Sequence, residues 1–290
     1  MTTTLNALLS LIDLEPLEHN IYRGRNRDIG TGRVFGGQVL AQALVAARRT
    51  VEESDREAHS LHGYFILPGD LSVPIVYFVD RLRDGGSFTT RRVTAIQRGR
   101  AIFNMSASFH VAQDGPDHQA PAPEAPDPEE VTPDVERIRA EAHRFPEELR
   151  PTLTQDRPID LRAVDPESLF DPTPSPASQL IWFRADGVLP DDTSTHQALL
   201  AYASDYGLLA TALRPHGLSV RSPEIQVASL DHALWFHRSF RMDDWLLYSL
   251  DGPAAAGARG FGRGSVFTRD GRLVASSAQE GLTRFRTLDT

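Results

Sequence analysis

The chain has 290 residues, a formal net charge of −9 and 40% hydrophobic residues, which fits about two compact units and excludes global disorder. It has no cysteine, and all 30 basic residues are arginine, which excludes disulfides, thiol nucleophiles, cysteine-bound metals and lysine Schiff bases. The acidic balance, the lack of a signal-peptide pattern and the lack of a long apolar run favour a cytoplasmic protein with no nucleic-acid partner and no membrane span.

Two helices and four strands are predicted in the first 111 residues. At the N-terminus, Leu5, Leu8, Leu9 and Ile12 form an apolar stripe with helical spacing. Residues 36–50 are apolar on nearly all sides, which is typical of a helix buried by its surroundings. The strand candidates that follow cover residues 59–68, 74–85, 88–99 and 100–111.

A proline-rich, acidic stretch follows. Residues 111–170 hold 15 acidic and 6 basic side chains, a net charge of −9 (6 minus 15). Proline and like charge oppose a packed core, so residues 112–133 are interpreted as an extended, solvated connector, with a partner-binding tail as the alternative. A short polar helix is expected over residues 134–150, interrupted near Pro146.

The last third of the chain resembles the first. A second apolar helix is predicted over residues 195–213, with Thr195 as a plausible cap. Strand candidates then cover residues 224–240, 245–252, 258–271 and 272–285. Because the hairpin turns at 97–100 and 269–272 match, we expect an internal duplication, with an N-terminal repeat (1–111), a linker (112–174) and a C-terminal repeat (175–290).

Asp205 is the most unusual residue of the second helix. A carboxylate in a buried helix costs several kcal/mol, on the order of magnitude, unless it is paired. It is therefore either a capped or solvent-facing aspartate or a general base with a shifted pKa. Ser229 and Gln279 are polar residues in strand-like segments, and spacing alone does not bring them to Asp205. The ten histidines include no His-x-x-x-His pair, so no metal site is expected.

Long motifs run along most of the chain. They are VFGGQVLAQAL (34–44), LHGYFILPGD (61–70), RDGGSFTTRRV (83–93), LPDD (189–192), YASD (202–205), RPHG (214–217), SLDHALWFHRSF (229–240), WLLYSLDGP (245–253), ARGFGRG (258–264) and LVASSAQEG (273–281). On these motifs the sequence resembles the acyl-CoA thioesterase II family. The resemblance implies an α+β double hotdog fold, in which two antiparallel sheets each wrap around a central helix.

The family resemblance also implies a site and a reaction. Its catalytic aspartate, hydroxyl and glutamine fall on Asp205, Ser229 and Gln279, and no cofactor is implied. The expected reaction is hydrolysis of acyl-CoA to fatty acid and CoA, with Asp205 as general base and two residues that hold the water. Arg259 and Arg263 are candidates for the CoA phosphates.

The sequence leaves two other functions open. One is an acyl-CoA hydratase or dehydratase of the same fold, whose chemistry usually needs a paired aspartate and histidine. Asp231 and His232 are adjacent on a strand and should therefore face opposite ways. The other is a non-catalytic acyl-CoA sensor. The family resemblance and the aromatic side chains crowded into residues 231–248 further suggest a homodimer or homotetramer.

Overall fold

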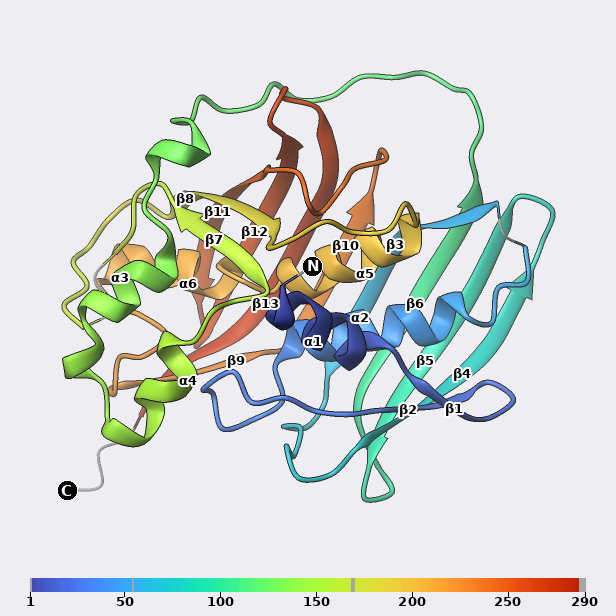
Figure 1. Ribbon diagram of the computed structural model, residues 1–290, viewed down its shortest axis with the longest axis horizontal. Coiled ribbons are helices and arrows are strands. Elements are labelled where there is room, and N and C mark those ends of the chain that lie inside the picture. Colours follow the sequence, from blue (N-terminus) through green and yellow to red (C-terminus); the bar gives the residue numbers. More distant parts are fainter. Residues whose placement is uncertain (1, 54, 168–169, 287–290) are drawn as a thin grey trace.

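The computed structural model describes residues 2–53, 55–167 and 170–286, and a 13-stranded antiparallel sheet dominates them (Figure 1). The helices are α1 (Thr3–Ile12), α2 (Gly36–Arg48), α3 (Asp134–Ala140), α4 (Arg150–Thr154), α5 (Thr193–Ala203) and α6 (Leu208–Leu213). The strands of the first half are β1 (Glu15–Glu18), β2 (Ile21–Gly24), β3 (Arg56–Phe65), β4 (Ile75–Asp84), β5 (Phe88–Gln97) and β6 (Arg100–Val111). Those of the second half are β7 (Ile159–Ala163), β8 (Ser178–Ala185), β9 (Ile225–Ser229), β10 (Asp231–Phe236), β11 (Leu246–Ala256), β12 (Arg259–Thr268) and β13 (Leu273–Phe285).

The sheet is continuous across the two halves, so the prediction of two separate sheets is wrong in this respect. Strands β3 and β10 pair antiparallel, from Asp231 opposite Tyr64 to Trp235 opposite Ser60. Outward from this pair the order is β6, β5, β4, β2, β1 on one side and β13, β12, β11, β8, β7 on the other. The pairing supplies partners for backbone groups that would otherwise lie at two open sheet edges.

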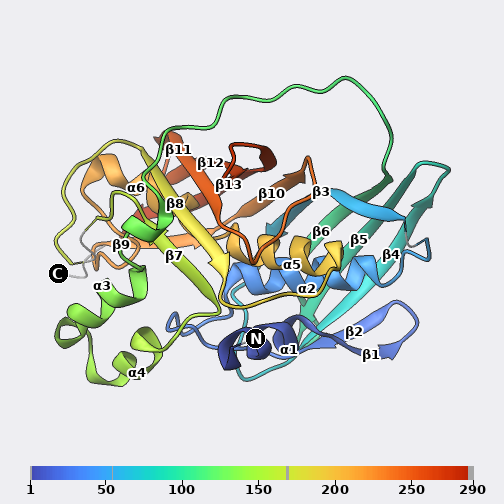
Figure 2. The same ribbon diagram turned by 45° about the horizontal axis from the view of Figure 1, so that its top comes forward.

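Helices α2 and α5 lie side by side in front of the sheet (Figures 1 and 2). Ten of the residues of α2 are buried, as its apolar sequence predicted. The two helices run antiparallel, because Gly37 at the start of α2 contacts Tyr202 near the end of α5. The main hydrophobic core includes both helices and both halves of the sheet. The N-terminal stripe also forms a helix, in which Leu5 and Leu8 are fully buried.

The second apolar segment forms two helices rather than the one predicted over residues 195–213. Helix α5 ends at Ala203 and α6 begins at Leu208, after Gly207 adopts a left-handed φ of 87°. The cap of α5 is Asp192, whose side chain accepts a hydrogen bond from the backbone N–H of Thr195, so Thr195 itself is not the cap. Asp205 consequently lies in a turn between two helices.

The proline-rich segment crosses from β6 to α3 as an extended arc, most of whose residues are exposed (Figure 2). It is not solvated throughout, however. Ala122, Ala125 and Val131 pack on a cluster made by Trp182, Trp245, Leu247 and Phe267. The indole N–H of Trp182 also donates to the Pro126 carbonyl at 2.9 Å. Part of this segment therefore covers apolar side chains of the second half.

Several strands were not anticipated from the sequence. The short strands β1, β2 and β8 were missed, and β7 lies inside the range assigned to the linker but pairs with β8. The predicted strand at 224–240 is divided at Leu230 into β9 and β10. In the described parts of the chain, no helix is both long and apolar enough to cross a membrane.

Candidate active site

Asp205 is held by backbone and side-chain donors from the other half and from the sheet. Its Oδ2 accepts from the backbone N–H of Gly37 at 2.9 Å, and its Oδ1 accepts from Nε2 of Gln279 at 2.7 Å. Only 6% of its side chain is exposed. The aspartate is thus not solvent-facing and does not cap a helix of its own segment, because its carboxylate accepts from the N–H of Gly37 in the first turn of α2.

Ser229 and Gln279 lie beside it. Ser229 ends β9 and stands opposite Gly281 of β13, two residues from Gln279. Nε2 of Gln279 is 3.3 Å from the Ser229 hydroxyl oxygen. Three side chains separated by 24 to 74 residues therefore meet, although their spacing gave no sign of it. Gln197, in the same apolar segment as Asp205, does not join this group and bonds the backbone of Ala58.

The three side chains line an open cleft of about 860 Å³. Its walls come from the segment before α2, from the start of α6 and from β9. The lining residues are Ile29, Thr31, Arg33, Val34, Phe35, Gly36, Asp205, Tyr206, Gly207, Leu209, Ala210, Val220, Ile225, Gln226, Val227, Ala228, Ser229, Gln279 and Arg286. A mostly apolar cleft with a few convergent polar groups is the usual form of a small-molecule site.

Burial raises the pKa of Asp205 from 3.8 to about 6, against the lowering effect of the hydrogen bonds from Gln279 and Gly37. The carboxylate is therefore ionised near neutral pH but more basic than an exposed aspartate. A group with this pKa accepts a proton from water more readily than an ordinary carboxylate does.

Gly36 and Gly37 allow the helix to approach the aspartate so closely. A Cβ on Gly36 would lie 2.7 Å from Oδ2 of Asp205, and a Cβ on Gly37 would lie 2.2 Å from the Tyr202 carbonyl oxygen. Because real Cβ atoms do not approach this closely, any larger residue would push α2 away from α5. The paired glycines of the VFGGQV motif thus shape the site, a role that the sequence analysis missed.

Comparisons with known proteins place the chain in a family. A family model described as acyl-CoA thioesterase matches residues 152–282, and one described as the acyl-CoA thioesterase N-terminal domain matches residues 24–110. Acyl-CoA thioesterase 2 of Haemophilus influenzae is 40% identical over 98% of this chain and 99% of its own length. The chain belongs to the acyl-CoA thioesterase II family. It is therefore a thioester hydrolase, as its motifs predicted.

Solved structures extend the similarity to the fold. An acyl-CoA thioesterase II from Mycobacterium marinum is 44% identical, with a TM-score of 0.79, and the match covers 97% of this chain and 99% of that chain. A hot dog fold protein from Alicyclobacillus acidocaldarius, at 20% identity and a TM-score of 0.77, shares the fold. The predicted hotdog architecture is thereby confirmed.

His232 is a second residue that the sequence analysis left out of the site. It faces away from Asp231, as predicted, but it lies 3.9 Å from Oδ1 of a different aspartate, Asp205. Its Nδ1 is 3.3 Å from Nε2 of Gln279, and its Nε2 is 2.9 Å from the Ser204 hydroxyl oxygen. Burial lowers the pKa of His232 to about 3, so the ring is neutral near pH 7.

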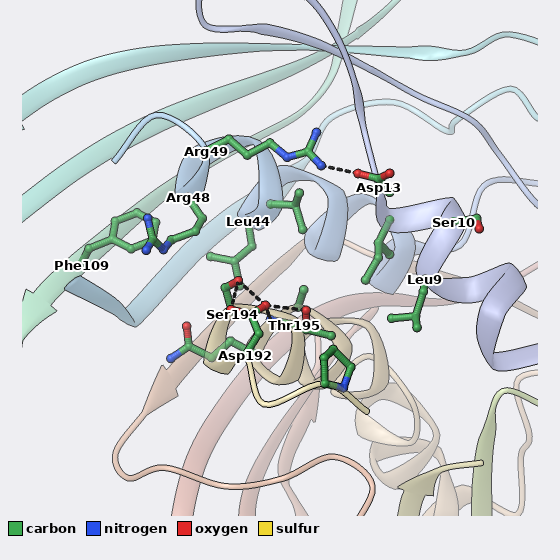
Figure 3. A pocket seen from close by; sticks show the side chains of 15 residues that line it. Leu9, Ser10, Asp13, Leu44, Arg48, Arg49, Phe109, Asp192, Ser194 and Thr195 are labelled. Carbon is green, nitrogen blue, oxygen red and sulfur yellow. Dashed lines mark hydrogen bonds and ion pairs between the residues drawn. The ribbon is translucent and has the colours of Figure 1, made fainter. Parts of the chain in front are cut away.

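A different pocket, of about 470 Å³, lies at the opposite ends of α2 and α5 under α1 (Figure 3). Figure 3 shows two aspartates at its wall, of which Asp13 pairs with Arg49, and Asp192 is bonded to Ser194 and Thr195 and caps α5. Two residues beyond the end of α2 the chain has Thr50, whereas two residues beyond α5 it has Asp205. This pocket therefore has no carboxylate at the position that corresponds to Asp205.

Proposed function

We propose that the enzyme hydrolyses acyl-CoA by general-base activation of a water molecule, with Asp205 as the base and with Ser229 and Gln279 as the residues that orient the water. The observation that carries this proposal is the meeting of these three side chains at the wall of one cleft. Carboxylate, hydroxyl and amide are the groups needed to take a proton from water and to fix its lone pair.

Catalysis would begin when the water attacks the thioester carbonyl while Asp205 accepts its proton. The carbonyl oxygen then becomes an anion, and the N-terminus of α2 provides a favourable dipole for it. Gly36, the first residue of α2, lines the cleft and presents its backbone there. Collapse of the tetrahedral intermediate breaks the carbon–sulfur bond, and Asp205 returns its proton to the departing sulfur, so that CoA thiol and the fatty acid are released and the base is regenerated.

We further propose Arg33 and Arg286 for the CoA phosphates, because both line the cleft and both are exposed. The earlier candidates fit less well. Arg259 is paired with Glu280, Arg263 is paired with Asp251, and neither lines the cleft. Guanidinium groups suit phosphate because they bind it in a bidentate way.

One observation favours the hydratase alternative, because the aspartate Asp205 and the histidine His232 lie close together. Both ring nitrogens of His232 are already occupied, however, and its relative exposure is 1%. The ring is therefore unable to reach an acyl chain in the cleft, so hydrolysis is the better supported reaction.

A parallel assay separates these reactions. The enzyme is mixed with saturated and with 2-enoyl acyl-CoA substrates of increasing chain length, and both free thiol and enoyl absorbance are followed. We expect thiol release from both series at constant enoyl absorbance. Loss of enoyl absorbance without thiol would support a hydratase, and binding with neither signal would support a sensor.

We also propose that the two halves arose by duplication of one helix-and-sheet unit. Support comes from the matching order of strands outward from β3 and β10 and from the antiparallel placement of α2 and α5. The cytoplasmic location expected from the sequence stays a prediction.

A further inference from the structure

The amide of Gln279 faces more acceptors than it has hydrogens. Its Nε2 lies 2.7 Å from Oδ1 of Asp205, 3.3 Å from Oγ of Ser229 and 3.3 Å from Nδ1 of His232. An amide nitrogen carries two hydrogens. The bond to Asp205 is the shortest and is charge-assisted, so it takes one of them. Ser229 and His232 then compete for the second.

The tautomer of His232 decides which acceptor is available. The Ser204 hydroxyl lies 3.1 Å from the Ala201 carbonyl and donates to it, so the hydroxyl oxygen is left to accept from His232. The hydrogen of the neutral ring is therefore on Nε2, and Nδ1 presents a lone pair to Gln279. The opposite tautomer would place an N–H against the amide N–H₂.

Ser204, at the end of this series of hydrogen bonds from Gln279 through His232, is itself held in place. The backbone carbonyl of Ser204 accepts from the Tyr248 hydroxyl at 2.9 Å, and that hydroxyl is also 2.6 Å from the Ser277 hydroxyl. Ser204, Tyr248, Ser277 and His232 are all buried. A buried hydrogen-bond network of this kind holds its members in one arrangement.

We infer that His232 is a positioning residue that acts through Gln279. By accepting the second amide hydrogen at Nδ1, it holds the amide with its nitrogen toward Asp205. It also leaves the Ser229 hydroxyl free to bond the attacking water. In this arrangement the imidazole neither touches substrate nor exchanges a proton. Its contribution is to fix the amide that holds the base, Asp205, and to leave Ser229 to hold the water. The inference rests on the proposed general-base mechanism.

The matched pair His232→Asn and His232→Gln tests this role. The Asn side chain places an acceptor near the position of Nδ1, whereas the Gln side chain reaches the position of Nε2 and loses the acceptor for Gln279. We expect His232→Gln to lower kcat by about 10- to 100-fold, the scale of a misplaced catalytic group, with KM changed by less than about threefold. His232→Asn should be at least about fivefold faster than His232→Gln. Equal kcat values for the two variants would overturn the inference.

A double-mutant cycle with Gln279→Ala separates positioning from a merely structural role. If His232 acts through Gln279, then His232→Gln should lower kcat by less than about threefold once Gln279 is alanine. A full multiplicative loss in that background would overturn the inference. A different result would contradict the proposed mechanism itself, namely a wild-type kcat in the single variant Gln279→Ala.

Two further variants serve as a control and as an alternative test. His237 also bonds a serine, Ser276, at 2.9 Å, but it is exposed, so His237→Gln should retain wild-type kcat. If the His232 variants do not fold, Ser204→Ala leaves the ring in place and removes the acceptor that sets its tautomer. We expect Ser204→Ala to lower kcat by about 3- to 10-fold, on the scale of a partly misplaced group, and unchanged kcat would contradict the tautomer argument.

Discussion

Burial disfavours the ionised form of Asp205, and this makes the free energy of unfolding depend on pH. Its pKa rises from 3.8 to about 6 on folding. Between these pH values the folded chain binds a proton that the unfolded chain releases, so this group's contribution to the free energy of unfolding falls as pH rises from about 4 to about 6. A shift of about two pKa units corresponds to about 3 kcal/mol.

We therefore expect Asp205→Asn to gain stability relative to wild type as pH rises. The difference in free energy of unfolding should grow by about 1–3 kcal/mol between pH 4.5 and pH 7.5, measured by urea unfolding. His232 titrates with the opposite sign, because burial lowers its pKa to about 3, but it is present in both proteins and cancels. A difference independent of pH would show that Asp205 keeps an ordinary pKa.

Ser229 and Gln279 are predicted to act as a unit, because in the proposed mechanism Ser229 holds the attacking water and Gln279 holds the base that deprotonates it. Ser229→Ala and Gln279→Ala should each lower kcat by at least about tenfold. The double variant should be at most about threefold slower than the slower single variant. Steady-state kinetics on one acyl-CoA measures this. Losses that multiply fully would place the two residues in separate steps.

At the scale of elements, the sequence predicted the long, periodic segments and missed the contacts that the fold creates. The apolar runs gave α2 and most of the central strands. The break after Ala203 was missed because α5 and α6 are both apolar and Gly207 was not recognised as a left-handed position. His232 was set aside by comparison with Asp231, whereas its actual neighbour is Asp205, 27 residues earlier in the chain.

The contacts among the site residues were also not predictable from local sequence. Asp205 stood out as a charge in an apolar segment, but Ser229 and Gln279 are ordinary strand residues that only family motifs singled out. The pairing of β9 and β13 brings them together. A single sequence does not encode this register in any local pattern, because it depends on the division of one strand segment at Leu230.

The proline-rich segment is expected to stabilise the fold without taking part in catalysis. Replacing residues 122–131 by a glycine–serine segment of equal length removes the cover over Trp182 and Trp245. We expect the Tm to fall by about 2–8 °C, as for a loss of about 1–2 kcal/mol, with kcat changed by less than about twofold. The same replacement at 112–116, outside this contact, is the control. A collapse of kcat at unchanged Tm would mean that the segment shapes the cleft.

In the whole molecule, the outer face of β3 and β10 is the surface best suited to an oligomer. Part of the aromatic surplus in 231–248 is accounted for, since Trp245 and Leu247 pack under the proline-rich segment. The outer face of β3 and β10 carries Tyr64, which is 61% exposed, and Trp235, whose ring packs against His62 at 5.0 Å. Around them stand small residues such as Ala233 and Ser276. A sheet face with exposed aromatic residues among small ones suits a second copy of the chain.

We therefore predict a homodimer or homotetramer that uses this face. Light scattering at micromolar concentration should give a mass of at least twice the 32.1 kDa chain. Tyr64→Asp combined with Trp235→Asp should shift the mass toward that of one chain, because paired charges oppose burial of the face. A wild-type mass near 32.1 kDa would refute the oligomer.

Thiol release by Asp205→Asn shows directly whether Asp205 is the general base. The substitution keeps the size of the side chain and removes the proton acceptor. We predict that kcat falls by about 10²- to 10⁴-fold, the usual loss for a positioned general base, with little change in KM. The matched control is Asp192→Asn, in the opposite pocket, which keeps a capping oxygen and should keep wild-type kcat. Wild-type kcat in Asp205→Asn would contradict the account.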